Sequence, residues 1–145
     1  MANKQMVLAS NLDTEKKVYG LIMCIAHEME AATAKILKHY GLSNTQLSIL
    51  DALDNSGLEV MTVNQIKGSM LDESPNVSRS LNKLMENEMI VKERDLIDQR
   101  VVKIRITDEG RRVHREADMA IMKEDKTSKL NEEEMKSLFD LLVKF

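Results

Sequence analysis

Residues 74–106, SPNVSRSLNKLMENEMIVKERDLIDQRVVKIRI, change from one hydrophobic period to another within a short stretch. In the first half apolar residues recur at helical spacing, and in the second half they alternate as in a half-buried strand. A helix followed at once by a hairpin leaves the chain few ways to bury both apolar faces. This stretch therefore constrains the fold more than any other part of the sequence.

The helix of this stretch is expected to begin at Ser74 and Pro75, because serine caps helix starts and proline is tolerated in the first turn. Its expected apolar face consists of Val77, Leu81, Leu84 and Met85. The opposite, polar face consists of Asn76, Arg79, Asn82, Lys83 and Glu86. An ordinary amphipathic surface helix would also have a charged outer face. Asn and Arg, however, are side chains that read base edges, and they stand where stronger helix formers would favour stability.

The second half of the stretch predicts a β-hairpin. Residues 102–106 alternate between apolar and polar side chains, and residues 90–94 are the expected partner strand. The tip between them carries Arg100 two residues after Asp98. A guanidinium suits the negative potential of a minor groove, and a nearby carboxylate would hold it in one rotamer. The alternative interpretation is an ordinary charged turn exposed to solvent, which would contain the same residues.

Composition excludes several classes of protein. The 145 residues, 43% apolar and 31% charged, predict one globular domain. No apolar run approaches the roughly 18 residues of a membrane span, and the N-terminal residues lack a signal core, so a cytoplasmic protein without membrane contact is expected. The single cysteine, Cys24, excludes a disulfide framework and a Cys-rich zinc site. An aromatic content of 3% without Trp argues against a stacking platform for single strands.

The net charge of −3 does not by itself suggest a nucleic-acid partner. Residues 74–106, however, hold seven Lys and Arg against five Asp and Glu, a balance of +2. The segments on either side, residues 1–73 and 107–145, have balances of −3 and −2. The one positive segment is the one with the proposed reading face, and its small excess predicts weak, salt-sensitive non-specific binding.

The remaining chain is mainly helical. Residues 1–11 are expected to form a loose terminus, and residues 12–40 a long helix that ends at Gly41. The apolar stripe of this helix is too long for a small domain to cover, which favours a partner helix as its cover. The stripe consists of Val18, Leu21, Ile22, Ile25, Met29, Ala32, Ile36 and Leu37.

Capping signals place the other helices. Ser43 with Gln46, and Thr62 with Gln65, form capping boxes, and a turn cluster at residues 54–57 separates the two helices. The second of these helices, a brief link and the helix from Ser74 make a helix-turn-helix, and the hairpin turns it into a winged helix. Two further helices are predicted, one capped by Thr107 and the last by a capping box of Asn131 and Glu134.

The sequence resembles the MarR family of bacterial transcriptional regulators from residue 12 onward. The resemblance is carried by SPNVSR at 74–79, by Arg94 with Asp98-Gln99-Arg100 in the wing, and by ITDEG at 106–110. It implies a mainly α fold with a small β-hairpin wing, in which a winged helix-turn-helix lobe joins an intertwined helical dimerisation region. The implied boundaries are residues 1–42 for an N-terminal dimerisation helix, 43–106 for the DNA-binding lobe and 107–145 for the C-terminal dimerisation helices.

The resemblance also implies a mode of action. The helix from Ser74 would enter the major groove, Arg100 the minor groove, and Asp98 would orient Arg100. Many family members are repressors released by small phenolic or lipophilic effectors that bind between the dimer helices and the DNA lobe. The expected DNA-contacting residues are Ser74, Asn76, Ser78, Arg79, Asn82, Lys83, Arg94, Asp98, Gln99 and Arg100.

Two positions depart from the family pattern. Glu88 stands where the turn after the recognition helix usually contains Gly, and a positive φ there would cost a non-Gly residue about 1 kcal/mol. The turn is therefore expected to be reshaped around Asn87. Leu96 and Ile97 at the wing tip replace polar residues, and they would pack on a deoxyribose or on a neighbouring protein surface.

Other candidate sites are weaker. Cys24 has no adjacent Lys or Arg to lower the pKa of its thiol, so a buried residue that only fills space in the core is favoured over a redox role. His27, His39 and His114 are too scattered for a metal site, and no cofactor is expected. Met23 and Met29 would either fill core gaps or line an effector pocket. No nucleophile–base constellation or phosphate loop is evident, so the protein is not expected to be an enzyme.

The sequence thus predicts a homodimeric, sequence-specific regulator of transcription, a repressor that binds a pseudo-palindromic site in double-stranded DNA. A second interpretation, favoured by the acidic total charge and the apolar wing tip, is a winged-helix protein-interaction module that does not bind DNA.

Overall fold

The structure is a computed structural model that describes residues 4–70, 76–95, 98, 100–124 and 129–145. It is mainly helical, with one small antiparallel sheet. The elements are α1 (Lys4–Ala9), α2 (Thr14–Leu37), the 3₁₀ turn η1 (Lys38–Tyr40), α3 (Asn44–Asn55), β1 (Met61–Thr62), α4 (Val63–Ser69), α5 (Val77–Glu86), β2 (Ile90–Arg94), β3 (Val102–Ile106), α6 (Asp108–Glu124) and α7 (Glu132–Leu142).

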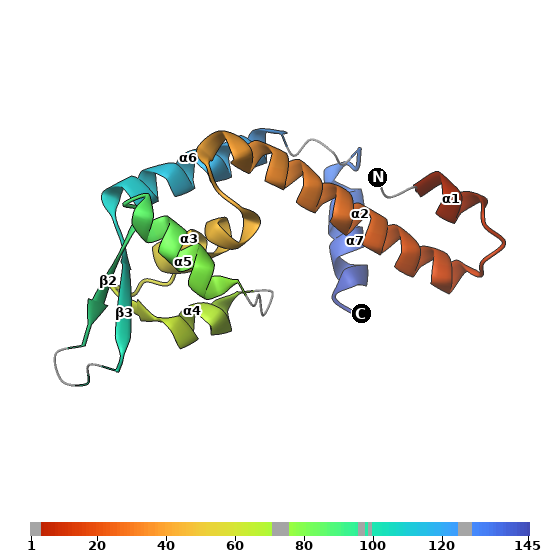
Figure 1. The fold of residues 1–145 in the computed structure, drawn as a ribbon. Coiled ribbons are helices and arrows are strands. Elements are labelled where there is room, and N and C mark those ends of the chain that lie inside the picture. The colour runs from red at the N-terminus through yellow and green to blue at the C-terminus, as the bar shows by residue number, and fades with distance from the viewer. Residues whose placement is uncertain (1–3, 71–75, 96–97, 99, 125–128) are drawn as a thin grey trace.

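A compact lobe and a helical arm make up the molecule (Figure 1). The lobe contains α3, α4, α5 and the hairpin of β2 and β3, whose strands extend away from the helices. The long α2 runs outward from the lobe, with α6 beside its inner part and α7 across its outer part. The predicted fold class, a winged helix-turn-helix with additional long helices, is confirmed.

Side-chain caps fix most helix starts, as the sequence predicted. Capping boxes are present at Ser43 with Gln46, at Thr62 with Gln65 and at Asn131 with Glu134. The end of the long helix is also confirmed, because Gly41 takes the left-handed conformation with φ of 66°. In this conformation its N–H reaches the Lys38 carbonyl, which satisfies a helix-terminal acceptor.

The N-terminal prediction was wrong. Residues 4–9 form α1, which packs on α2 instead of forming a loose terminus. A Cβ at Gly20 would come within 3.1 Å of Val7, so the missing side chain allows the close approach. An ion pair of 2.5 Å between Lys4 and Glu28 adds a second link.

The sheet has the strand order β1-β3-β2, and all its pairings are antiparallel. Both predicted hairpin strands are confirmed, with Ile90 opposite Ile106 and Arg94 opposite Val102. The core of the lobe joins the sheet to the end of α2, to α3, α4 and α5, and to α6. Its most buried side chains are Leu37, Ile49, Leu50, Ile66, Val77, Leu81, Leu84, Ile90 and Ile104.

The arm has no comparable core. Most of the apolar stripe of α2 is at least partly exposed in the single chain, and so are Leu138, Leu141, Leu142 and Phe145 in the α7 segment. Met23 and Met29 are exposed as well, so of the two expected roles, neither methionine fills a core gap in the single chain. Cys24 is only partly buried, which corrects its assignment as buried filler. None of the described helices is long and apolar enough to cross a membrane.

Candidate nucleic-acid interface

Helix α5 presents two chemically distinct faces. Val77, Leu81 and Leu84 are buried as predicted. The inner face also includes Ser80, whereas Met85 is 42% exposed, so its assignment to the core was wrong. The outward side chains include all five of the predicted polar face, Asn76, Arg79, Asn82, Lys83 and Glu86, and also Ser78.

The start of α5 differs from the prediction. The helix begins at Val77 with Asn76 as its N-cap residue, and the Asn76 side chain makes no capping hydrogen bond. The Asn76 carbonyl instead accepts the first helical bond, from Ser80, at 2.9 Å. Ser74 and Pro75, the predicted cap and first turn, lie outside the described residues.

The wing tip is a turn held by carboxylates. Asp98 Oδ1 accepts from the backbone N–H of Arg100 at 3.0 Å, and Asp95 Oδ1 accepts from that of Asp98 at 3.1 Å. Asp95 also pairs with Lys103 on β3. Asp98 therefore shapes the backbone at Arg100, whereas the sequence had assigned it to the guanidinium. Gln99, Leu96 and Ile97 lie outside the described residues.

The turn between α5 and β2 corrects another prediction. Glu88 takes the left-handed conformation with φ of 57°, while Asn87 has an ordinary φ of −90°, so the turn is not reshaped around Asn87. The Glu88 and Met89 N–H groups donate to Met85 and Leu84 carbonyls at 3.0 and 2.9 Å, which closes the helix end. These bonds, and not a glycine, hold the strained residue in place.

The ITDEG segment, residues 106–110, also holds this turn, through hydrogen bonds from Thr107. Thr107 donates its N–H to the Met89 carbonyl at 3.0 Å and its hydroxyl to the Glu88 carbonyl at 2.7 Å. The same hydroxyl accepts from the Gly110 N–H at 3.0 Å, which confirms Thr107 as the cap of α6. A Cβ at Gly110 would collide with the Met89 carbonyl oxygen. The motif thus fixes the angle between α5, the wing and α6.

One side chain that sequence reasoning missed joins α5 to the wing. Lys92 on β2 donates from Nζ to Asn82 Oδ1 at 2.6 Å. Strand alternation puts Lys92 on the face of buried Ile90, a position where an apolar residue is expected. That departure from the alternation was the signal that could have identified Lys92.

A second missed feature ties the lobe to α6. Asp54, predicted to lie in a turn between two helices, belongs to α3, and its side chain is 7% exposed. Its Oδ2 lies 3.0 Å from His114 Nδ1 and 3.7 Å from Arg115 Nε, and its Oδ1 pairs with Arg111. Burial would raise the pKa of the Asp54 carboxyl, but bonds from His114 and Arg111, with the Arg111 charge, lower it below its ordinary value.

Several cations of the interface are not neutralised by carboxylates. In the part of the chain that the structure describes, Arg79, Lys83, Lys92 and Arg100 form no ion pair. Arg105 and Arg112, by contrast, each pair with two glutamates. Among the described residues, no three His, Cys, Asp or Glu side chains form a group that could hold a metal ion.

These elements define the class of protein. A capped helix-turn-helix followed by a hairpin wing is a winged-helix fold, and residues 31–117 match the family described as transcriptional regulator SarA/Rot. The chain belongs to this family of transcriptional regulators. A search of curated proteins gave no match.

Solved structures of MarR-like regulators share the fold, which confirms the resemblance predicted from the sequence. A MarR-like transcription regulator from Bacillus cereus has 22% identity and a TM-score of 0.79, over 90% of this chain and 94% of that one. An organohalide-sensing regulator bound to 2,4-dichlorophenol has 23% identity and a TM-score of 0.78, over 92% and 80% of the chains. A variant of S. aureus MepR bound to an oligodeoxyribonucleotide has 28% identity and a TM-score of 0.57, over 86% and 91%.

Proposed function

We propose that this regulator binds double-stranded DNA in a sequence-specific manner, with α5 in the major groove and the wing tip in the minor groove. The observation that carries the proposal is the exposed row of Arg79, Asn82 and Lys83 on a helix whose other face is buried in the lobe. Arginine and asparagine are the side chains that read base edges, and lysine neutralises phosphates. The DNA-bound MepR variant supports this assignment by its shared fold.

The wing supplies a second contact. Arg100 has no ion pair within the described residues, and the Asp98 carboxylate holds its backbone at the end of the hairpin. A guanidinium in this position suits the narrow, strongly negative minor groove. Ser74, Asn76, Ser78, Arg94 and Gln99 complete the proposed contact set beside these residues.

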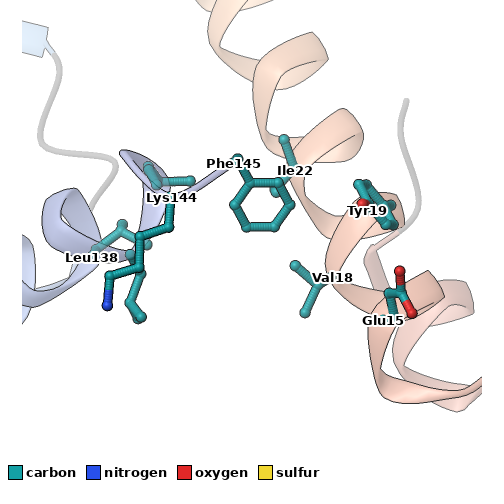
Figure 2. Close-up of a pocket in the computed structure, with 9 residues that line it drawn as sticks. Glu15, Val18, Tyr19, Ile22, Leu138, Lys144 and Phe145 are labelled. Atoms are coloured by element: carbon teal, nitrogen blue, oxygen red, sulfur yellow. The ribbon is translucent and has the colours of Figure 1, made fainter.

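The active form is proposed to be a homodimer built on the arm. The outer part of α2 and the α7 segment enclose an open groove of about 720 Å³ lined by Val18, Tyr19, Ile22, Leu138 and Phe145, among others. Figure 2 shows Phe145 reaching toward Ile22 and Tyr19, whose ring it meets edge-on at 5.8 Å. Such an exposed apolar surface is more than one chain can cover, and α2 and α7 of a second copy would fill it.

A dimer gives the three expected segments their roles. Residues 1–42 and 107–145 would join the two copies, and residues 43–106 of each would bind one half of a pseudo-palindromic site. Binding of this kind across a promoter would repress transcription, in the cytoplasm, where the chromosome of a bacterium lies.

A small phenolic or lipophilic effector is proposed to release the DNA. A second hollow, of about 320 Å³, lies between the end of α2 and α6 and is lined by Lys35, Ile36, His39, Tyr40 and Ala120. It adjoins both the lobe and the arm, so a ligand there could change the angle between them. The 2,4-dichlorophenol-bound regulator and a Bordetella bronchiseptica protein whose DNA binding is regulated by 6-hydroxynicotinic acid support this mode by analogy.

The test is binding of the purified full-length protein to a pool of genomic DNA fragments at several salt concentrations. Specific, salt-dependent enrichment is expected, because phosphate contacts release counterions.

Arg100→Ala should weaken binding to many sequences, and Arg79→Ala should relax specificity at one base pair by about 1–3 kcal/mol. Arg112→Ala is the matched control, since the charge of Arg112 is already neutralised by Glu109 and Glu116 on α6. A wild-type protein that enriches nothing at low salt would instead be a protein-interaction module.

A further inference from the structure

The contact between Lys92 and Asn82 determines which way the Asn82 amide faces. Lys92 Nζ and Asn82 Oδ1 are 2.6 Å apart. An ammonium group has three donors and no acceptor, so only the oxygen of an amide can face it. The Asn82 NH₂ group must therefore point away from Lys92.

The position of this pair makes the orientation relevant to recognition. Asn82 lies on the exposed face of α5, and Lys92 is half-buried on β2, which packs against α5. Lys92 forms no ion pair within the described residues, so its charge stays available beside the amide. The pair thus joins the reading helix to the wing at the surface proposed to meet DNA.

The Asn82 NH₂ group, which faces away from Lys92, determines which base the amide can bind. Asparagine reads adenine with both of its polar atoms, because its NH₂ donates to N7 while its oxygen accepts from the N6 amino group. Lys92 takes one of the two lone pairs of this oxygen and places a charged donor beside the other, which disfavours the approach of a second donor such as the adenine N6 amino group. Two N–H donors next to an ammonium instead match guanine, whose O6 and N7 are both acceptors.

We propose that Lys92 is a specificity-determining residue, which positions the Asn82 amide so that the pair reads guanine in preference to adenine. The proposal rests on the proposed DNA binding and goes beyond it by naming the base and the residue that selects it. Lys92 acts here through Asn82, as a positioning residue.

The experiment is selection of bound duplexes from a random DNA pool by the full-length protein, followed by affinity measurements on the selected site. Asn82→Ala identifies the base pair that Asn82 reads, as the position whose preference disappears. At that position the wild type should prefer guanine over adenine by about tenfold or more. Lys92→Met keeps the length and apolar stem of the side chain but removes the ammonium, and should reduce this preference to within about threefold.

Two further variants separate positioning from simple loss of charge. Lys92→Arg keeps a donor for Asn82 Oδ1 and should retain the guanine preference. Lys83→Met removes one charge from α5 without contact to Lys92, and should lower affinity in a salt-dependent way with the guanine preference intact. All variants alter exposed or half-buried surface positions, and thermal unfolding would verify that each is folded.

Three results would overturn the proposal: an adenine preference in the wild type, an unchanged guanine preference in Lys92→Met, or no position whose preference depends on Asn82. Failure of the proposed function gives a different result, because a wild-type protein that does not bind DNA enriches no sequence at all, even at low salt.

Discussion

His114 Nδ1 on α6 and Asp54 Oδ2 on α3 lie 3.0 Å apart, with side chains only 6% and 7% exposed. The contact links the lobe that carries the proposed reading helix to the helix that leaves it toward the arm. Around it, Arg111 pairs with the other carboxylate oxygen, Arg115 approaches at 3.7 Å, and Asp51 faces the second histidine nitrogen at 3.4 Å. A buried carboxylate of this kind is tolerated because its oxygens are occupied by donors.

The pH dependence of stability follows from this arrangement. The pKa of Asp54 is lower in the folded protein than its ordinary value of about 3.9, so its charged form is stabilised by folding. The contribution is fully present above that ordinary pKa and is lost as pH falls through the folded value. Asp54→Asn keeps the shape but not the charge, and should cost about 1–3 kcal/mol at neutral pH. Urea unfolding of both proteins should show this difference shrinking below about pH 4; a difference independent of pH would contradict the assignment.

Glu88→Gly should stabilise the protein. Glu88 has φ of 57°, a conformation that costs an L-residue about 1–2 kcal/mol and glycine almost nothing. The larger entropy of glycine in the unfolded chain offsets part of the gain, so the expected net effect is about 0.5–1 kcal/mol. Asn87→Gly is the matched control, since Asn87 has a negative φ and only the entropic loss remains. Thermal unfolding distinguishes the two, and a stabilising Asn87→Gly together with a neutral Glu88→Gly would show that the strain lies elsewhere.

Gly110→Ala should destabilise the corner between α5, the wing and α6. The added Cβ would collide with the Met89 carbonyl oxygen, which is backbone and accepts from Thr107, so relief requires a shift of the whole turn. Overpacking of this kind costs about 1–3 kcal/mol. Gly68→Ala in α4 is the control, because nothing lies within 4 Å of its Cβ, and helix propensity makes it neutral or slightly stabilising. Equal unfolding free energies for the two variants would refute the role given to Gly110.

Local signals in the sequence predicted the parts of the fold that depend on neighbouring residues. The capping boxes at Ser43, Thr62 and Asn131 and the strand alternation of the hairpin gave correct elements, because each depends on a few side chains within one turn or one strand pair. The outward side chains of α5 followed from its period in the same way.

The errors concern features decided by distant contacts. Asp54 was assigned to a turn because its neighbours are turn formers, yet it lies at the end of α3, where His114, sixty positions away, holds it in a buried site. Glu88 keeps a strained conformation because Thr107 and the helix end hold its backbone, and Lys92 meets Asn82 only once the strand lies against α5. The partners of each contact lie in different secondary-structure elements, so no single helical or strand period contains both of them.

The proposed homodimer makes a prediction about α7. Phe139 is 65% exposed in the single chain, so a charge there would be harmless to a monomer but would be buried in the interface of a dimer. Phe139→Asp should therefore raise the dissociation constant of the dimer by at least about tenfold while leaving the lobe folded. Ser137→Asp adds the same charge to an exposed polar position of the same helix and should leave association unchanged. Sedimentation equilibrium of the three proteins, with circular dichroism as the check on folding, measures this difference. A monomeric wild type, or equal dissociation constants for both variants, would show that the apolar face of α7 is not where two copies meet.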